Sequence, residues 1–174
     1  MDIRFIRNLF LFVGVSLSLT FVSSAQEKTN IISDSNFYAL IIDKNGATQR
    51  YETTVVPNIP DFVCYGWQLK LTNASNLVNF REKFSLPYEP NYWENEDNTY
   101  ATNTISNDRK TSITEKFIVP DDGWIENSWC VAEGDPNGIY IMEIFISDIF
   151  VHEFKFEVVP VNQFRKLQNE DIAR

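Results

Sequence analysis

The chain has 174 residues, 44% of them hydrophobic, and a net charge of −9 at pH 7, which suits one folded domain with a sizeable core. The negative charge argues against nucleic acid and anionic membrane surfaces as partners, because Lys and Arg provide most contacts to phosphate groups. An acidic surface also keeps many exported proteins in solution, so charge by itself selects no function.

The first 25 residues have the three parts of a secretory signal peptide. Arg4 and Arg7 carry positive charge, an uncharged apolar run covers residues 9–22, and small residues lead up to Ala25. The apolar run is shorter than the roughly 20 residues that a membrane anchor needs to span a bilayer. We therefore expect cleavage after Ala25 and export to the periplasm or the extracellular space. Cleavage would remove two arginines and one aspartate, so the mature chain would carry −10, with no membrane span.

A polar stretch at residues 26–35 is predicted to form a flexible leader before the first strand. Residues 37–43 and 48–56 are rich in β-formers and flank Asn45-Gly46. This dipeptide predicts a tight hairpin, because both central positions of such a turn need a positive φ.

Two further strands are predicted from alternating side chains. Residues 62–71 place Trp67 on an apolar face that should lie in the core, with Cys64 on the opposite face. Residues 78–86 point a row of hydrophobic side chains inward, but Glu82 interrupts this row. A charge at an inward position predicts a β-bulge or an edge strand there.

Five more strands are predicted at residues 99–105, 111–119, 128–132, 140–146 and 150–158, and residues 160–174 should form a polar, weakly helical C-terminal tail. About nine strands at spacings of roughly 8–12 residues, with no convincing helix, indicate an antiparallel sandwich or barrel. The predicted domain covers residues 36–159.

The segment Gly134-Asp135-Pro136-Asn137-Gly138-Ile139-Tyr140 resembles the start of the penultimate strand of immunoglobulin-like domains. There, a Gly-x-Tyr after an acidic turn forms a tyrosine corner, in which the phenol bonds back to upstream backbone. The longer pattern of Gly66-Trp67, residues 81–87 and residues 134–136 is similar to exported bacterial β-domains of unassigned function. The resemblance implies an immunoglobulin-like sandwich of roughly 7–9 strands, and it carries no chemistry, because such sandwiches host many functions.

Cys64 and Cys130 are the two cysteines of the chain. After export, two cysteines in one domain favour a disulfide, and the alternative is a pair of buried thiols. Met142 stands where antibody-type domains have their second bridging cysteine. The resemblance therefore implies that a Cys64–Cys130 bond would differ from the inter-sheet disulfide of those domains.

Enzymatic chemistry finds little support in the residue types present. The single histidine, His152, is in step with Phe150 and Phe154 and is expected to be structural. One histidine and two paired cysteines leave a zinc site without ligands, and no cofactor motif is present. Acidic loops keep two alternatives open, namely oxygen ligands for calcium and a carboxylate pair of a hydrolase. We expect no enzyme, no cofactor and no metal.

Aromatic residues give the best indication of a binding site. Tyr92, Trp93 and Tyr100 belong to an acidic loop at residues 87–100, and Trp124 follows a glycine turn. Such side chains anchor protein interfaces or stack on sugar rings, or they pack the loop onto its own domain. We expect a non-enzymatic module that recognises a protein or envelope component, and the alternative is a carbohydrate-binding domain that uses Tyr92, Trp93 and Trp124.

Overall fold

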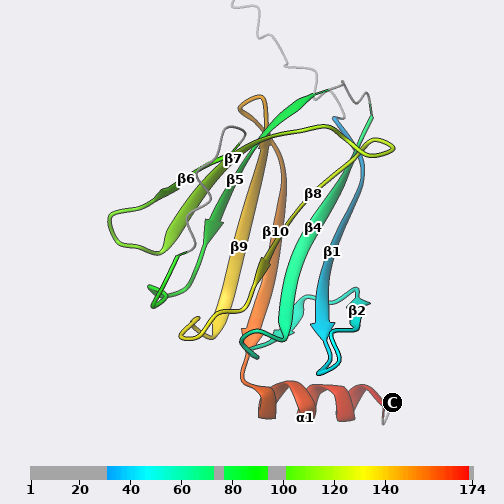
Figure 1. Cartoon of the computed structure of the whole chain (residues 1–174), viewed down its shortest axis with the longest axis vertical. Helices are drawn as coiled ribbons and strands as arrows, with labels where there is room; N and C mark the ends of the chain where they lie inside the picture. The colour runs from blue at the N-terminus through cyan, green and yellow to red at the C-terminus, as the bar shows by residue number, and fades with distance from the viewer. Residues whose placement is uncertain (1–30, 73–76, 94–100, 173–174) are drawn as a thin grey trace, which may run out of the picture.

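The computed structural model describes residues 31–72, 77–93 and 101–172, which form two β-sheets packed face to face and one helix (Figure 1). The smaller sheet has the strand order β2-β1-β4-β8, and the larger sheet has the order β3-β10-β9-β5-β7-β6. The described elements are β1 (Ile32–Ile42), β2 (Thr48–Tyr51), β3 (Val55–Pro57), β4 (Val63–Leu71), β5 (Val78–Ser85), β6 (Ala101–Ile105), β7 (Thr111–Ile118), β8 (Trp124–Cys130), β9 (Gly138–Ile146), β10 (Ile149–Val159) and α1 (Val161–Ile172).

Alternating burial explains how these strands build the core. In β4 the predicted inward face is confirmed, because Tyr65, Trp67 and Leu69 are almost completely buried. The Trp67 ring meets the Phe80 ring of β5 edge-on, with 5.3 Å between centroids. Aromatic contacts of this kind join the two sheets and fill the space between them.

The strand order is that of an immunoglobulin-like sandwich. β1, β4 and β8 lie side by side in one sheet, and β10, β9 and β5 lie side by side in the other. β3 pairs in parallel with β10, so the chain changes sheets between β2 and β3. The predicted single strand at residues 48–56 was therefore wrong, since its two halves pair with different sheets. The expected immunoglobulin-like architecture is confirmed.

Two predicted local structures are present, the first with a different turn from the one expected. The hairpin between β1 and β2 is confirmed, but of its two central residues only Gly46 has a positive φ, 82°, so the expectation of a positive φ at Asn45 was wrong. The Asp43 carboxylate holds this turn by accepting hydrogen bonds from the N–H groups of Asn45 and Ala47. At the start of β9 the buried Tyr140 hydroxyl donates a hydrogen bond of 2.7 Å to the carbonyl oxygen of Pro136. This bond is the tyrosine corner.

The disulfide joins neighbouring strands within one sheet. Cys64 of β4 lies directly opposite Cys130 of β8 in the register, and the two are bonded. The bond ties β8, an edge strand of the smaller sheet, to the middle of the domain. It differs from the inter-sheet bond of antibody-type domains, as the resemblance implied.

Glu82 lies in a regular central strand of the larger sheet. β5 lies between β9 and β7, and its pairing with both strands continues through Glu82 without a register shift. The predicted bulge or edge position was therefore wrong. The carboxylate points into the core because donors from the facing sheet satisfy it there, and this removes the need for local distortion.

The boundaries at the two ends of the domain also differ from expectation. β1 begins at Ile32, so the last residues of the expected leader already pair with β4. After β10, α1 lies across the end of the sandwich, where a loose tail was expected (Figure 1). The Pro160 carbonyl starts this helix by accepting hydrogen bonds from Gln163 and Phe164. The described residues contain no helix long and apolar enough to cross a membrane.

Candidate functional site

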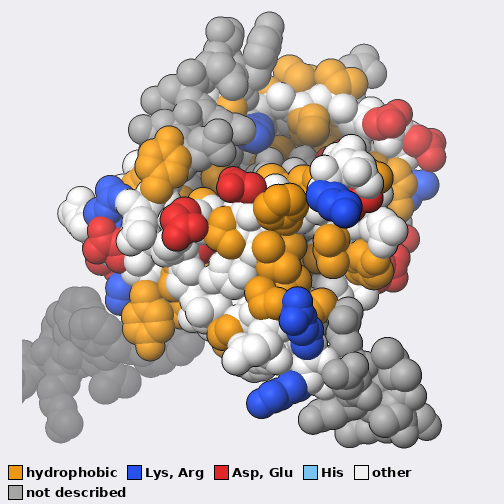
Figure 2. Space-filling model, turned by 60° about the horizontal axis from the view of Figure 1, so that its bottom comes forward, with side chains coloured by type: hydrophobic (Ala, Val, Ile, Leu, Met, Phe, Trp, Pro, Cys, Tyr) orange, Lys and Arg blue, Asp and Glu red, His pale blue; other side chains and the backbone are white. Residues whose placement is uncertain are grey.

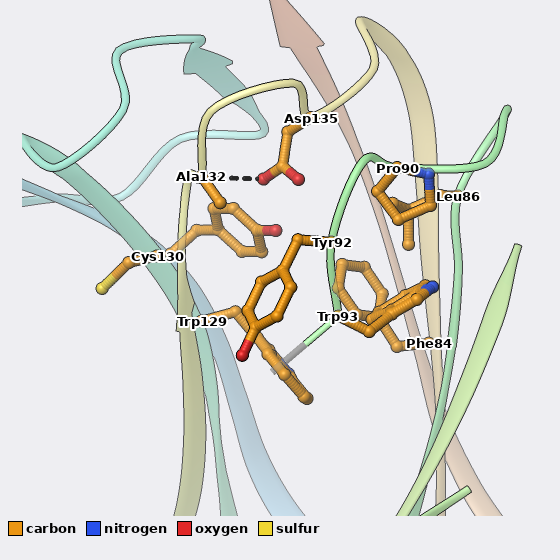
Figure 3. A pocket seen from close by; sticks show the side chains of 10 residues that line it. Phe84, Leu86, Pro90, Tyr92, Trp93, Trp129, Cys130, Ala132 and Asp135 are labelled. Atoms are coloured by element: carbon orange, nitrogen blue, oxygen red, sulfur yellow. Dashed lines mark hydrogen bonds between the residues drawn. The ribbon is translucent and has the colours of Figure 1, made fainter. Parts of the chain in front are cut away.

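An aromatic pocket opens between β8 and the segment at residues 87–93 (Figure 3). Its volume is about 90 Å³. The lining comes from both sheets, from that segment and from the turn after β8, and consists of Tyr65, Phe84, Leu86, Pro90, Tyr92, Trp93, Trp129, Cys130, Ala132 and Asp135. At the end of the sandwich where β10 runs into α1, hydrophobic side chains gather in the middle of the surface, with acidic side chains on both sides (Figure 2).

Trp93 forms a packed wall of this pocket. It is 8% exposed, and its ring meets Phe84 edge-on at 5.9 Å between centroids. Its indole N–H donates a hydrogen bond of 2.8 Å to the Arg109 carbonyl. The Arg109 side chain in turn pairs with Glu89 at 2.6 Å. Trp93 therefore anchors the segment to the turn between β6 and β7, and little of its surface is open to solvent.

A second contact fixes the segment to the turn before β9. The Asn91 side chain lies so close to Gly134 that a Cβ atom there would come within 1.9 Å of its amide nitrogen. Gly134 also has a φ of 87°, a region that favours glycine. The segment at residues 87–93, which forms one side of the pocket, is thus fixed both to the turn between β6 and β7 and to the turn before β9.

Tyr92 is the exposed residue at the mouth of the pocket. It is 63% exposed, and its ring lies between Trp93 and Trp129 in the close view (Figure 3). Tyr88, on the same segment, is 66% exposed. Both phenol rings are accessible to a partner at this end of the domain.

Trp129 forms the opposite wall, and a buried carboxylate holds it. Its indole N–H donates a hydrogen bond of 2.7 Å to Oε1 of Glu82, which is completely buried. Asn127 donates to the same oxygen at 3.1 Å, and the Trp67 indole donates to Oε2. Lys116 donates to the Asn127 side-chain oxygen at 3.0 Å.

Burial raises the pKa of Glu82, and this effect exceeds the lowering by its three hydrogen bonds and by the charge of Lys116. Asp135, in the turn beside the pocket, also has its pKa raised by burial, while the Ala132 N–H that it accepts at 2.9 Å acts in the opposite direction. Asp135 is half-buried and lines the pocket, whereas Glu82 is completely buried behind Trp129.

The residues that sequence analysis selected do not form one surface. Trp124 begins β8, whereas Trp129 and the pocket lie near its end, roughly 17 Å away at about 3.4 Å per residue. Lys70 lies over the Trp124 ring, with its nitrogen 5.5 Å from the centroid. Tyr100 and most of the acidic part of the predicted loop lie outside the described residues.

Sequence analysis missed Trp129 and the role of Glu82. The sequence did contain an indication of this role. A glutamate in an otherwise hydrophobic row is buried only if hydrogen-bond donors lie opposite it, and Glu82 stands in such a row. His152 is partly buried, with its ring centroid 4.4 Å from that of Phe154, and burial lowers its pKa. Among the described residues, no group of three or more His, Cys, Asp or Glu side chains is arranged to hold a metal ion.

Comparison with known proteins identifies one family. The profile of the PM0630 beta sandwich domain matches residues 35–159. Curated proteins give no match. Among solved structures, an immunoglobulin-like protein from Pseudomonas aeruginosa is similar with a TM-score of 0.49 and 14% identity, over 78% of this chain and 99% of that one. The alkylpurine DNA glycosylase AlkC of Pseudomonas fluorescens, bound to DNA with an abasic-site analog, has a TM-score of 0.32 and 9% identity, over 71% of this chain and 30% of that one.

Proposed function

The chain belongs to the PM0630 beta sandwich domain family, and we propose that it is an exported, non-enzymatic module that recognises a protein or envelope component. The aromatic pocket beside β8 receives one apolar side chain of that partner. Tyr92 covers the mouth and contacts the partner around this side chain.

The size and lining of the pocket carry this proposal. A volume of about 90 Å³ is small beside the roughly 300–1,000 Å³ of sites for small molecules. It suits one inserted side chain, and such anchors in well-packed pockets dominate the energy of protein interfaces. Exposed tyrosines beside a packed tryptophan are also typical of these interfaces.

Export is the second part of the proposal. The N-terminal residues have the charge and hydropathy pattern of a secretory signal. The Cys64–Cys130 disulfide is the form that these cysteines take in an oxidising compartment. Both features support a periplasmic or extracellular location.

A carbohydrate ligand is the alternative, and exposed Tyr88 and Tyr92 favour it, because flat phenol rings stack on sugars. Trp93 and Trp124 contribute less than expected to this alternative. The Trp93 ring is packed against Phe84, and Trp124 lies at the other end of β8.

Photocrosslinking in the cells that make the protein tests the proposal. Benzoylphenylalanine in place of Tyr92 should yield an adduct with one protein, identified by mass spectrometry. The same group in place of Tyr51, which is 44% exposed on β2, is the control and should not yield it. The purified partner should then bind Tyr92→Ala about tenfold more weakly than wild type, a loss typical of an interface anchor.

The controls separate the alternatives. Trp124→Ala should bind the partner like wild type, because Trp124 lies outside the pocket. Binding on a glycan array that Tyr92→Ala abolishes, without a protein adduct, would replace the protein partner by a carbohydrate. Neither an adduct nor glycan binding would contradict the binding proposal as a whole.

A further inference from the structure

We propose that the partner is an extended peptide segment that adds as a fifth strand to the free edge of β8, with one of its side chains in the aromatic pocket. This inference rests on the proposed function and specifies the kind of partner. It follows from the direction of the backbone groups of β8, from the regularity of its edge and from the position of the pocket beside it.

The register shows which backbone groups of β8 point away from β4. Just beyond the end of β8, the Val131 N–H bonds to the Val63 carbonyl, and at the other end the Leu71 N–H bonds to the Gly123 carbonyl. Hydrogen-bonded pairs alternate with non-bonded pairs in an antiparallel ladder. The backbone groups of Glu126, Ser128 and Cys130 therefore point to the free side of the strand.

This edge is open and regular. Glu126, Ser128 and Cys130 are all exposed, and the pairing of β4 with β8 has no register shift. In the part of the chain that the structure describes, no strand pairs with this side of β8. Natural edge strands are usually short or blocked by proline, lysine or a bulge, because open edges pair with other chains. β8 has seven residues and none of these devices, whereas β3, at an edge of the larger sheet, has three residues.

The two sheets leave a place for such a strand. Trp129 of β8 packs over Phe84 of β5, and Asn127 of β8 meets Lys116 of β7. β6 is the next strand of the larger sheet, and no described strand of the smaller sheet lies beyond β8 to cover it. An added strand would occupy this position in the smaller layer.

The pocket then explains how the partner is selected. Side chains alternate between the two faces of a strand, so a partner residue opposite Trp129 points inward, as Trp129 does. The pocket lies on this inward side, with Trp93 as its far wall and Tyr92 at its mouth. A partner residue opposite Glu126 points outward, where the carboxylate favours Lys or Arg. Backbone bonds thus supply affinity, and one apolar and one basic side chain supply selectivity.

Amide hydrogen exchange of the intact domain, followed by NMR, tests the proposal directly. The probes are seven-residue peptides, acetyl-Thr-Val-X-Thr-Val-Lys-Thr-amide, in which X is Phe or Ala and lies three residues from Lys. The Phe peptide should slow exchange at Glu126, Ser128 and Cys130 at least tenfold, because these amides exchange freely in the unbound protein. The Ala peptide should bind more weakly, because it leaves the pocket empty.

Methylated peptides test the backbone pairing without altering the protein. N-methylation of the central Thr, whose N–H faces β8 in this register, should abolish protection. N-methylation of the following Val, whose N–H points away, should leave protection intact. Equal effects of the two methyl groups would contradict strand addition.

A substitution on β8 gives the matching test from the protein side. Ser128→Pro removes an N–H that points to the free edge and leaves the bonds to β4 in place. It should weaken binding of the Phe peptide roughly tenfold at an unchanged unfolding temperature. Ser128→Thr keeps the N–H, so the contrast between these two variants isolates the donor.

The outcomes distinguish this inference from the proposed function. Protection of none of the three amides at millimolar Phe peptide would overturn strand addition. A crosslinked partner that depends on Tyr92 but binds Ser128→Pro like wild type would also overturn it and leave the pocket proposal standing. Peptide binding that Ser128→Pro weakens and Tyr92→Ala leaves unchanged would support strand addition and contradict the role of the pocket mouth.

Discussion

The indole N–H of Trp129 and the carboxylate of Glu82 meet across 2.7 Å, and this bond joins the wall of the pocket to the centre of the sandwich. Glu82 also accepts the indole N–H of Trp67, which is completely buried. One carboxylate therefore satisfies two tryptophans and Asn127 on the facing sheet. A carboxyl group that does not reach the surface therefore holds Trp129, one wall of the pocket.

Glu82→Gln should lower the free energy of unfolding by about 1–3 kcal/mol at pH 7. The amide oxygen can still accept from Trp129 and Asn127, but the amide nitrogen then faces the Trp67 N–H, and a buried donor remains unpaired. Urea unfolding at equilibrium measures the loss.

A double-mutant cycle provides the control. Trp67→Phe removes the donor that Glu82→Gln leaves unpaired, so the loss in the double variant should be smaller than the sum of the two single losses. Additive losses would show that the Trp67–Glu82 contact contributes little to stability.

The stability advantage of wild type over Glu82→Gln should increase as the pH falls from 7 to 4.5. Burial raises the pKa of Glu82 above its ordinary value of 4.5 in the folded protein. The folded chain therefore binds the proton of Glu82 more tightly than the unfolded chain does. The stabilisation that comes from this proton is fully present below pH 4.5 and is lost as the pH rises through the folded-state pKa. Asp135 and His152 titrate in both proteins, so the difference in unfolding free energy isolates Glu82. A difference that stays constant or falls toward pH 4.5 would contradict this assignment.

Removal of the disulfide by Cys64→Ala together with Cys130→Ala should lower the free energy of unfolding by about 4 kcal/mol. The bond spans 66 residues, and closing so long a loop restricts the unfolded chain. Non-reducing urea unfolding measures the loss. Reductant should destabilise wild type by a similar amount and leave the double variant unchanged, and an effect on both proteins would point to another cause.

Gly66→Ala should destabilise the domain by about 1–3 kcal/mol through steric conflict. A Cβ atom at this position would lie 2.6 Å from the Asn127 carbonyl oxygen and 2.8 Å from the Tyr38 hydroxyl. Gly46→Ala is the matched control, because the space around Gly46 is open and only its φ of 82° opposes the change, at about 1 kcal/mol. Thermal unfolding compares the two variants, and an equal or larger loss at Gly46 would refute the steric explanation.

The exported protein should begin at Gln26, which intact-mass measurement of material from the export compartment can establish. Small residues before the cut fit the peptidase pocket, so Ala25→Arg should block cleavage and retain residues 1–25. An uncleaved wild-type chain, or one that remains in the cytoplasm, would remove the export part of the proposal.

Local patterns in the sequence were sufficient for the strands and some of their turns. The alternation in residues 62–71 predicts β4 and the buried face of Trp67, and Asn45-Gly46 predicts the first hairpin. Tyr140 bonds to a carbonyl four residues earlier, so its corner depends on a short segment alone. Each of these features involves neighbours within a few residues, where side-chain period and turn chemistry determine the outcome.

Only the tertiary structure decided the candidate site. Glu82 can remain in the core because its donors come from positions 15, 45 and 47 residues away, and no local pattern shows that they converge. The stacking of the sheets likewise places Trp124 far from Trp93. It also places Trp129 across the pocket from the 87–93 segment. Periodicity determines which face of a strand is buried, but the partners across a sandwich depend on strand order, because facing residues are far apart along the chain.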